Sequence, residues 1–102
     1  MEVKYSLSGE KIDFYFAGEL DEHYAKGVKD YLETVLGKYP KIKKVVFNMQ
    51  GLSFMDSTGI GMLLGRYKRL KKAGVECFIE NPQVNVEKVL EVSGIYDVMP
   101  RI

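Results

Sequence analysis

A chain of 102 residues can form one hydrophobic core but not two, so we expect a single domain over residues 1–102. Its hydrophobic share of 46% and charged share of 28% are typical of a globular protein. The formal net charge of +1 gives no overall field that would attract nucleic acid or a membrane surface. With Cys77 as the one cysteine, an internal disulfide and a multi-cysteine metal site are both excluded.

The first residues do not have the composition of an export signal. Met1–Tyr5 is charged and lacks a long apolar core, and no apolar run approaches the ~20 residues needed to cross a bilayer. We therefore expect a cytoplasmic protein that makes no membrane contact.

Two alternating segments begin the chain and predict a β-hairpin. Val3, Tyr5 and Leu7 alternate with polar residues, and Ile12–Phe16 alternates again after a glycine-containing turn. Apolar residues at helical spacing over residues 24–36 then predict a helix that Asp21 can cap.

The remaining elements follow as strands and helices in alternation. Lys43–Phe47 ends in a continuous apolar run, which predicts a central strand covered on both faces. After it we expect a helix from about Ser57 to Lys72, a strand over Val75–Ile79, a helix over Val86–Val92 and a short final strand over Ile95–Met99. The predicted fold class is therefore α/β, with a mixed sheet of four to five strands: an N-terminal hairpin, then parallel βαβαβα with helices packed on the sheet.

The junction between the central strand and its helix combines residues that suit a helix start. Asp56, Ser57 and Thr58 stand there, and either Asp56 or Ser57 can be the N-cap. A phosphate on Ser57 would gain from the helix dipole and be repelled by Asp56 beside it. The residues alone leave open whether Ser57 only caps the helix or is also a modification site.

Catalytic constellations are nearly absent. His23 is the only histidine, and its polar neighbours in a first helical turn indicate solvent exposure. Without a second histidine, neither a nucleophilic triad nor a typical zinc site has its parts. The glycines of Gly59–Gly65 are misspaced for a dinucleotide-binding loop and fall inside the helix. We expect no catalytic residue, no metal and no cofactor.

Two features of the helix expected from about Ser57 to Lys72 each allow two interpretations. Gly61 and Gly65 share a face, and they either let the helix pack closely on the sheet or leave a flat surface for a partner. The basic residues near its end are either a solvated face that complements the helix dipole or a rim for an acidic partner. These residues are Arg66, Lys68, Arg69, Lys71 and Lys72.

The junction resembles the signature of STAS domains, specifically that of bacterial anti-sigma-factor antagonists. Leu52–Gly61 (LSFMDSTGIG) carries most of the resemblance. Gly18–Asp21 (GELD), Leu64–Lys68 (LGRYK) and Ser93–Ile95 (SGI) also look like family segments, so the resemblance runs from about Gly18 to Met99.

The resemblance implies a partner-switching protein rather than an enzyme. The unphosphorylated form would bind an anti-sigma factor that is also a serine kinase and so free the sigma factor. Phosphorylation of Ser57, or alternatively Thr58, would abolish binding, and a serine phosphatase would restore it. By the same resemblance, partner binding would use Asp21, Asp56, Ser57, Thr58, Gly59 and Gly61. Family members commonly carry a further helix after the last strand, which we expect to be absent or very short here.

Two other hypotheses are compatible with these residues. The domain could be a STAS module of a stress-signalling complex or of a lipid-transport system. It could also be a small nucleotide-binding or phosphate-handling enzyme that uses the same helix start, although the lysine of a phosphate loop is missing.

Overall fold

The computed structural model describes residues 1–102 as four strands, three α-helices and one turn of 3-10 helix. In chain order the elements are β1 (Glu2–Ser8), β2 (Lys11–Leu20), α1 (Ala25–Lys38), β3 (Lys44–Met55), α2 (Ser57–Lys72), β4 (Glu76–Glu80), α3 (Val84–Ser93) and η1 (Ile95–Asp97). The predicted ββαβαβα order is confirmed, with four strands. None of the helices combines the length and the apolar composition that a membrane span requires.

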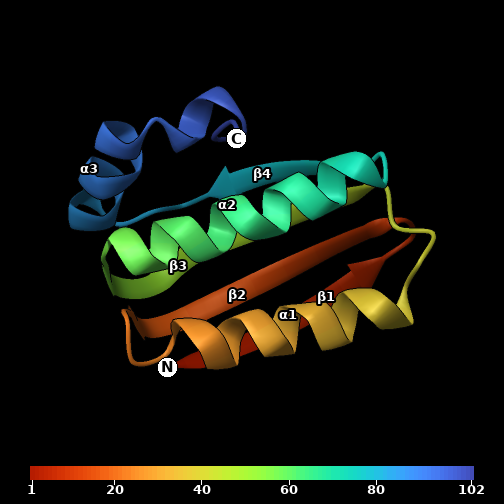
Figure 1. Cartoon of the computed structure of the whole chain (residues 1–102), viewed down its shortest axis with the longest axis horizontal. Coiled ribbons are helices and arrows are strands. Elements are labelled where there is room, and N and C mark those ends of the chain that lie inside the picture. The colour runs from red at the N-terminus through yellow and green to blue at the C-terminus, as the bar shows by residue number, and fades with distance from the viewer.

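The four strands form one mixed sheet in the order β1-β2-β3-β4. The β1–β2 pair is antiparallel, and the β2–β3 and β3–β4 pairs are parallel. The sheet grows in one direction from β2 to β4, so two right-handed crossovers place both connecting helices on the same face. Accordingly, α1 and α2 lie side by side across one face, and α3 lies at the end of the sheet where α2 begins (Figure 1).

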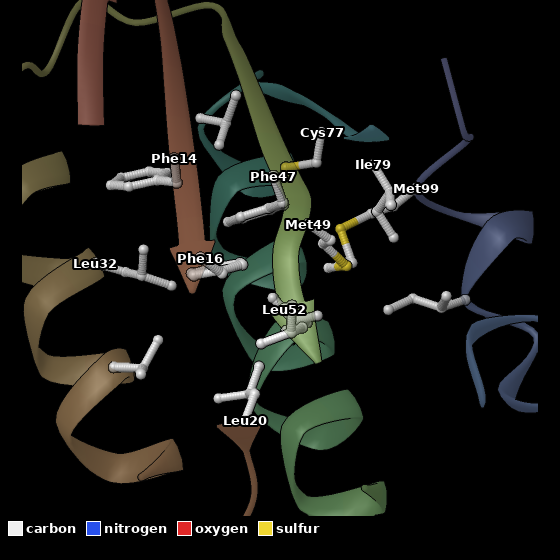
Figure 2. Close-up of a cluster of buried hydrophobic side chains, with 14 of the residues drawn as sticks. Phe14, Phe16, Leu20, Leu32, Phe47, Met49, Leu52, Cys77, Ile79 and Met99 are labelled. Atoms are coloured by element: carbon white, nitrogen blue, oxygen red, sulfur yellow. The ribbon is translucent and has the colours of Figure 1, made fainter. Parts of the chain in front are cut away.

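Aromatic rings from β2 and β3 form the centre of the core. The rings of Phe14 and Phe16 each stack on Phe47, with ring centroids 5.9 Å apart in both pairs. Leu32 of α1 packs beside them, and all four side chains are almost completely buried (Figure 2). Because these rings belong to neighbouring strands in register, they fix the alignment of the two strands whose ends carry the candidate site.

The central position of β3 is confirmed by its burial. Val45–Met49 are all buried, and β3 pairs with β2 on one side and β4 on the other. The strand is longer than the apolar run that predicted it. It continues to Met55, so only one residue separates it from α2. This extension places Asp56 at the edge of the sheet where the parallel strands end.

The prediction of a final strand over Ile95–Met99 is wrong. Gly94 has a φ of +78°, which turns the chain back after α3, and the next residues form η1. The N–H of Met99 donates to the carbonyl of Ile95 at 2.9 Å, so this segment bonds within itself and not to the sheet. Only beyond it does the chain reach β4, where the Ile79 N–H donates to the Pro100 carbonyl at 3.0 Å.

Candidate functional site at the start of helix α2

Asp56 is the N-cap of α2, which resolves the choice between Asp56 and Ser57. Its backbone is extended, and its Oδ1 accepts hydrogen bonds from the N–H groups of Thr58 at 3.0 Å and Gly59 at 3.1 Å. These are two of the N–H groups that a helix start otherwise leaves without partners. Ser57 is consequently the first residue of the helix, and its hydroxyl is not used for capping.

Asp56 also contacts the loop between β2 and α1. Its Oδ2 accepts a hydrogen bond from the N–H of Glu22 at 3.2 Å, and its own N–H donates to the carbonyl of Leu20 at 3.4 Å. The side chain therefore joins two segments that are 34 residues apart in sequence. Parallel strands end at the same edge of a sheet, which is why the β2–α1 and β3–α2 junctions meet here.

Asp21 lies in the same loop and caps the turn that precedes α1. Its Oδ1 accepts the N–H of Tyr24 at 3.2 Å, and its carbonyl accepts the N–H of Ala25 at 2.9 Å. The helix itself begins at Ala25 after Tyr24 as its N-cap, so the prediction that Asp21 caps the helix is wrong: its side chain caps only the preceding turn. Asp21 is half-buried and directly precedes Glu22, the residue that Asp56 binds.

Ser57 and Thr58 are both exposed, but they line different hollows on the surface. Ser57 lines a hollow of about 450 Å³ between α2 and α3, together with Ile60, Val89 and Val92. Thr58 lines a hollow of about 420 Å³ between α2 and α1. The two neighbouring hydroxyls thus have different surroundings.

The hollow beside Ser57 is mainly apolar. Lys88 is its only charged lining residue, and Val92 of α3 is 90% exposed. Val84 of the same helix is 74% exposed. Apolar side chains this exposed are typical of surfaces that bind another protein when they gather in a patch.

Gly59 is the glycine of this helix that close packing requires. A Cβ at this position would lie 2.9 Å from the carbonyl oxygen of Leu20 and 3.1 Å from Cγ of Met55. Gly59 is buried, and its missing side chain lets α2 begin directly against the ends of β2 and β3. It supports the site and is not on its exposed surface.

The interpretation of Gly61 and Gly65 as residues that let α2 pack on the sheet is wrong. A Cβ at either position would meet no atom within 4 Å. Both glycines line the hollow between α1 and α2, on the side of α2 that does not face the sheet. The alternative, a flat surface for a partner, is the one that remains.

Arg66 does not belong to the solvated basic face. It is only 7% exposed and forms an ion pair with Glu33 of α1, which also lies 3.6 Å from Arg69. Burial, together with the charge of Arg69, lowers the pKa of Arg66. The exposed part of the basic run is formed by Lys68, Arg69, Lys71 and Lys72.

Two residues with chemically reactive side chains, His23 and Cys77, remain to be placed. His23 is exposed and packs edge-on against Tyr24, with ring centroids 4.6 Å apart. Cys77 is buried in β4, and burial raises the pKa of its thiol to about 12. No group of three or more His, Cys, Asp or Glu side chains is placed to hold a metal ion.

The fold and the site define a class of α/β domain. In this class, β3 leads into a helix that an aspartate caps, and two exposed hydroxyl residues stand at the start of that helix. The family model of the STAS domain matches residues 5–102, and the chain belongs to this family. The match includes most of the N-terminal hairpin, which the expected resemblance from about Gly18 did not cover.

Relatives and solved structures agree with this assignment. An anti-sigma F factor antagonist from Paenibacillus polymyxa is 32% identical over 84 residues, which are 82% of this chain and 71% of that relative. The structure of the anti-sigma factor antagonist SpoIIAA in its unphosphorylated form is 27% identical, with a TM-score of 0.83 over 99% of this chain and 88% of that one. The structure of the Bacillus cell fate determinant SpoIIAA in the phosphorylated form is 26% identical, with a TM-score of 0.74 over 99% of this chain and 91% of that one.

Sequence reasoning missed the contribution of α3 to the site. The sequence predicted only that a helix spans Val86–Val92, and the structure shows that Val92 of this helix is almost fully exposed beside Ser57. A signal was present, because Val92 is two residues after the buried Leu90 and so cannot share its helix face. Nothing in the sequence pattern indicated that this exposed side would lie beside α2.

Proposed function

We propose that this protein is an anti-sigma-factor antagonist that is switched by phosphorylation of Ser57. The observation that carries the proposal is the position of Ser57, exposed at the first residue of α2 and at the rim of an apolar hollow. Membership of the STAS family and similarity to a relative named as an anti-sigma F factor antagonist support it. The partner is an anti-sigma factor that is also a serine kinase, and a separate serine phosphatase removes the phosphate.

The partner surface is proposed to surround the helix start. Ser57, Thr58 and Gly61 are exposed there, and the adjoining loop contributes Asp21. Asp56 and Gly59 act beneath this surface, because Asp56 holds the loop and Gly59 permits the close packing. The apolar hollow of Ile60, Val89 and Val92 then supplies the area from which the partner excludes water.

A phosphate on Ser57 has little within the chain to neutralise it. The N–H groups of Thr58 and Gly59, which could otherwise bind it, already donate to Asp56. A phosphoryl group adds roughly −1.5 to −2 charges at pH 7, next to that carboxylate. Lys88 is the only cation lining the hollow. When a partner covers the hollow, the phosphate must lose its water, which costs several kcal/mol unless the partner provides a matching cation.

Ser57 fits this switch better than Thr58. A phosphate on Thr58 would enter the hollow that Lys26 and Lys29 line, where two cations of the chain itself could neutralise it. A phosphate on Ser57 would enter the apolar hollow. A phosphate on Ser57 should therefore weaken binding at an apolar interface more than a phosphate on Thr58 would.

Binding by purified variants tests the proposal. The purified anti-sigma factor of the same organism should bind the wild-type protein, and ATP should release it with phosphate mapped to Ser57 by mass spectrometry. Ser57→Ala should stay bound in the presence of ATP, and Ser57→Asp should bind at least about tenfold more weakly.

Thr58→Ala is the matched control, because it removes the neighbouring hydroxyl and should leave both release and phosphorylation intact. Equal affinity of Ser57→Ala and Ser57→Asp would contradict the proposed mechanism. Phosphate found only on Thr58 would contradict the assignment of the acceptor.

A further inference from the structure

The hollow between α1 and α2 is lined by cations and by no carboxylate. Lys26 and Lys29 come from α1, and Arg66 comes from α2. Lys26 and Lys29 are exposed, and neither forms an ion pair. They stand three residues apart, which places them on the same face of the helix. The hollow, here called the α1–α2 groove, therefore presents two lysines that form no ion pair, beside an arginine that is paired with Glu33.

Arg66 adds a donor without a partner. One side of its guanidinium is paired with Glu33, but its Nε makes no hydrogen bond although the residue is only 7% exposed. Buried N–H groups are normally bonded, so the pairing with Glu33 does not use the whole hydrogen-bonding capacity of Arg66.

Gly61 and Gly65 leave the α2 side of the groove open. A Cβ at either position would have no atom within 4 Å, so no contact inside the chain requires a glycine there. Two glycines nevertheless weaken the middle of a helix. Without side chains, these two positions leave room for another backbone to approach α2 closely.

We infer that the α1–α2 groove docks an acidic segment of the protein partner, with carboxylates on Lys26 and Lys29 and its backbone close to Gly61 and Gly65. The inference rests on the proposed function for the identity of that partner. No aromatic side chain lines the groove, so a nucleotide base would have nothing to stack on. Thr58 lines the groove, and Ser57 next to it lines the apolar hollow. One partner can therefore cover both hollows at the start of α2.

Charge reversal at the groove tests this inference. We compare Lys26→Glu/Lys29→Glu with Lys68→Glu/Lys72→Glu, using the purified anti-sigma factor of the same organism and the unphosphorylated proteins. Both pairs change the net charge equally, and Lys68 and Lys72 are exposed on α2 outside the groove. The groove variant should lose at least about tenfold in affinity, and the control less than about threefold. The difference should shrink as salt is raised, because screening weakens exposed charge pairs.

A steric variant gives a second measurement without a change of charge. Gly65→Leu fills the groove with a residue that favours helix, so it should fold normally and bind the anti-sigma factor at least about tenfold more weakly. Circular dichroism and urea unfolding of each variant separate loss of binding from loss of fold.

The possible outcomes separate the two proposals. Normal binding by the groove variants, or equal weakening by both charge-reversal pairs, would overturn the groove inference and leave the proposed function standing. Failure of the wild-type protein to bind the anti-sigma factor would overturn the proposed function and the groove inference together.

Discussion

The carboxylate of Asp56 accepts a hydrogen bond from the backbone N–H of Glu22 at 3.2 Å, across 34 residues of sequence. With its other oxygen the same side chain caps α2, so one residue orders both junctions at this edge of the sheet. Asp56 therefore shapes the surface on which Ser57 is exposed.

Asp56 gives a graded test of this double role. Asp56→Ala loses the cap and the bond to Glu22, so the free energy of unfolding should fall by about 1–2 kcal/mol. Asp56→Asn retains one acceptor oxygen for the cap and loses only the bond to Glu22, so the fall should be smaller, about 0.5–1 kcal/mol. Urea unfolding measures both. Equal losses would mean that the two oxygens do not act separately.

Ser57 should affect binding without affecting stability. Its side chain is exposed and makes no hydrogen bond within the chain, so Ser57→Ala and Ser57→Asp should each change the free energy of unfolding by less than about 0.5 kcal/mol. Urea unfolding checks this on the same samples that are used for binding. A large loss for Ser57→Asp alone would indicate that negative charge disturbs the helix start and would contradict a switch that acts only at the interface.

Gly59 and Gly61 form a matched pair two residues apart in α2. In Gly59→Ala the new methyl group would lie 2.9 Å from the Leu20 carbonyl oxygen, and we expect a loss of about 1–3 kcal/mol in the free energy of unfolding. In Gly61→Ala the methyl group enters open space and the helix gains propensity, so we expect a gain of about 0.5–1 kcal/mol. Thermal unfolding would show shifts of opposite sign. A stabilising Gly59→Ala would contradict the close packing at the helix start.

Glu33 should contribute to stability chiefly by neutralising the charge of Arg66. Glu33→Gln leaves the Arg66 guanidinium buried without its counter-charge, and we expect a loss of about 1–3 kcal/mol. Replacing both residues with apolar side chains, as in Glu33→Leu/Arg66→Met, should recover part of this loss, because no charge then remains buried. Urea unfolding of Glu33→Leu, Arg66→Met and the double variant forms the cycle. Full additivity of the two changes would show that the pair does not interact.

Cys77 should be inert to thiol reagents in the native protein. Burial raises the pKa of its thiol to about 12, so almost no thiolate forms at pH 8, and the sulfur is also shielded. A disulfide reagent should label Cys77 quickly in denaturant and hardly at all without it. Rapid labelling of the folded protein at pH 8 would contradict this prediction.

The same raised pKa makes stability depend on pH in the alkaline range. An unfolded cysteine loses its proton near pH 8.5, whereas folded Cys77 keeps it to about pH 12. The folded state therefore binds more protons between these values, and the contribution of Cys77 to stability should fall as pH rises through this window. Cys77→Ala should lack this part of the pH dependence in urea unfolding between about pH 8 and 10.

The sequence by itself determined the order of the elements and the place of the strand-to-helix junction that forms the candidate site. Alternation at Ile12–Phe16, the apolar run ending at Phe47 and the helical spacing after Ser57 are local patterns, because each depends only on which face of one element is buried. The strand-to-helix junction at Asp56 and Ser57 follows from the same local chemistry. The prediction of a strand was wrong at Ile95–Met99. The backbone N–H and carbonyl groups of this short apolar segment form hydrogen bonds within a turn of 3-10 helix instead.

Only the tertiary structure decided what each site residue faces. The sequence left Arg66 within a basic run that was either a solvated face or a rim for an acidic partner, and the fold pairs it with Glu33. The sequence predicted a helix over Val86–Val92, and the fold places the exposed Val92 in the hollow between α2 and α3. The same packing gives Ser57 an apolar hollow and Thr58 a basic one, although the two residues are adjacent. The surroundings of these residues depend on contacts between elements that are distant in the chain. The periodicity within a single element therefore cannot predict them.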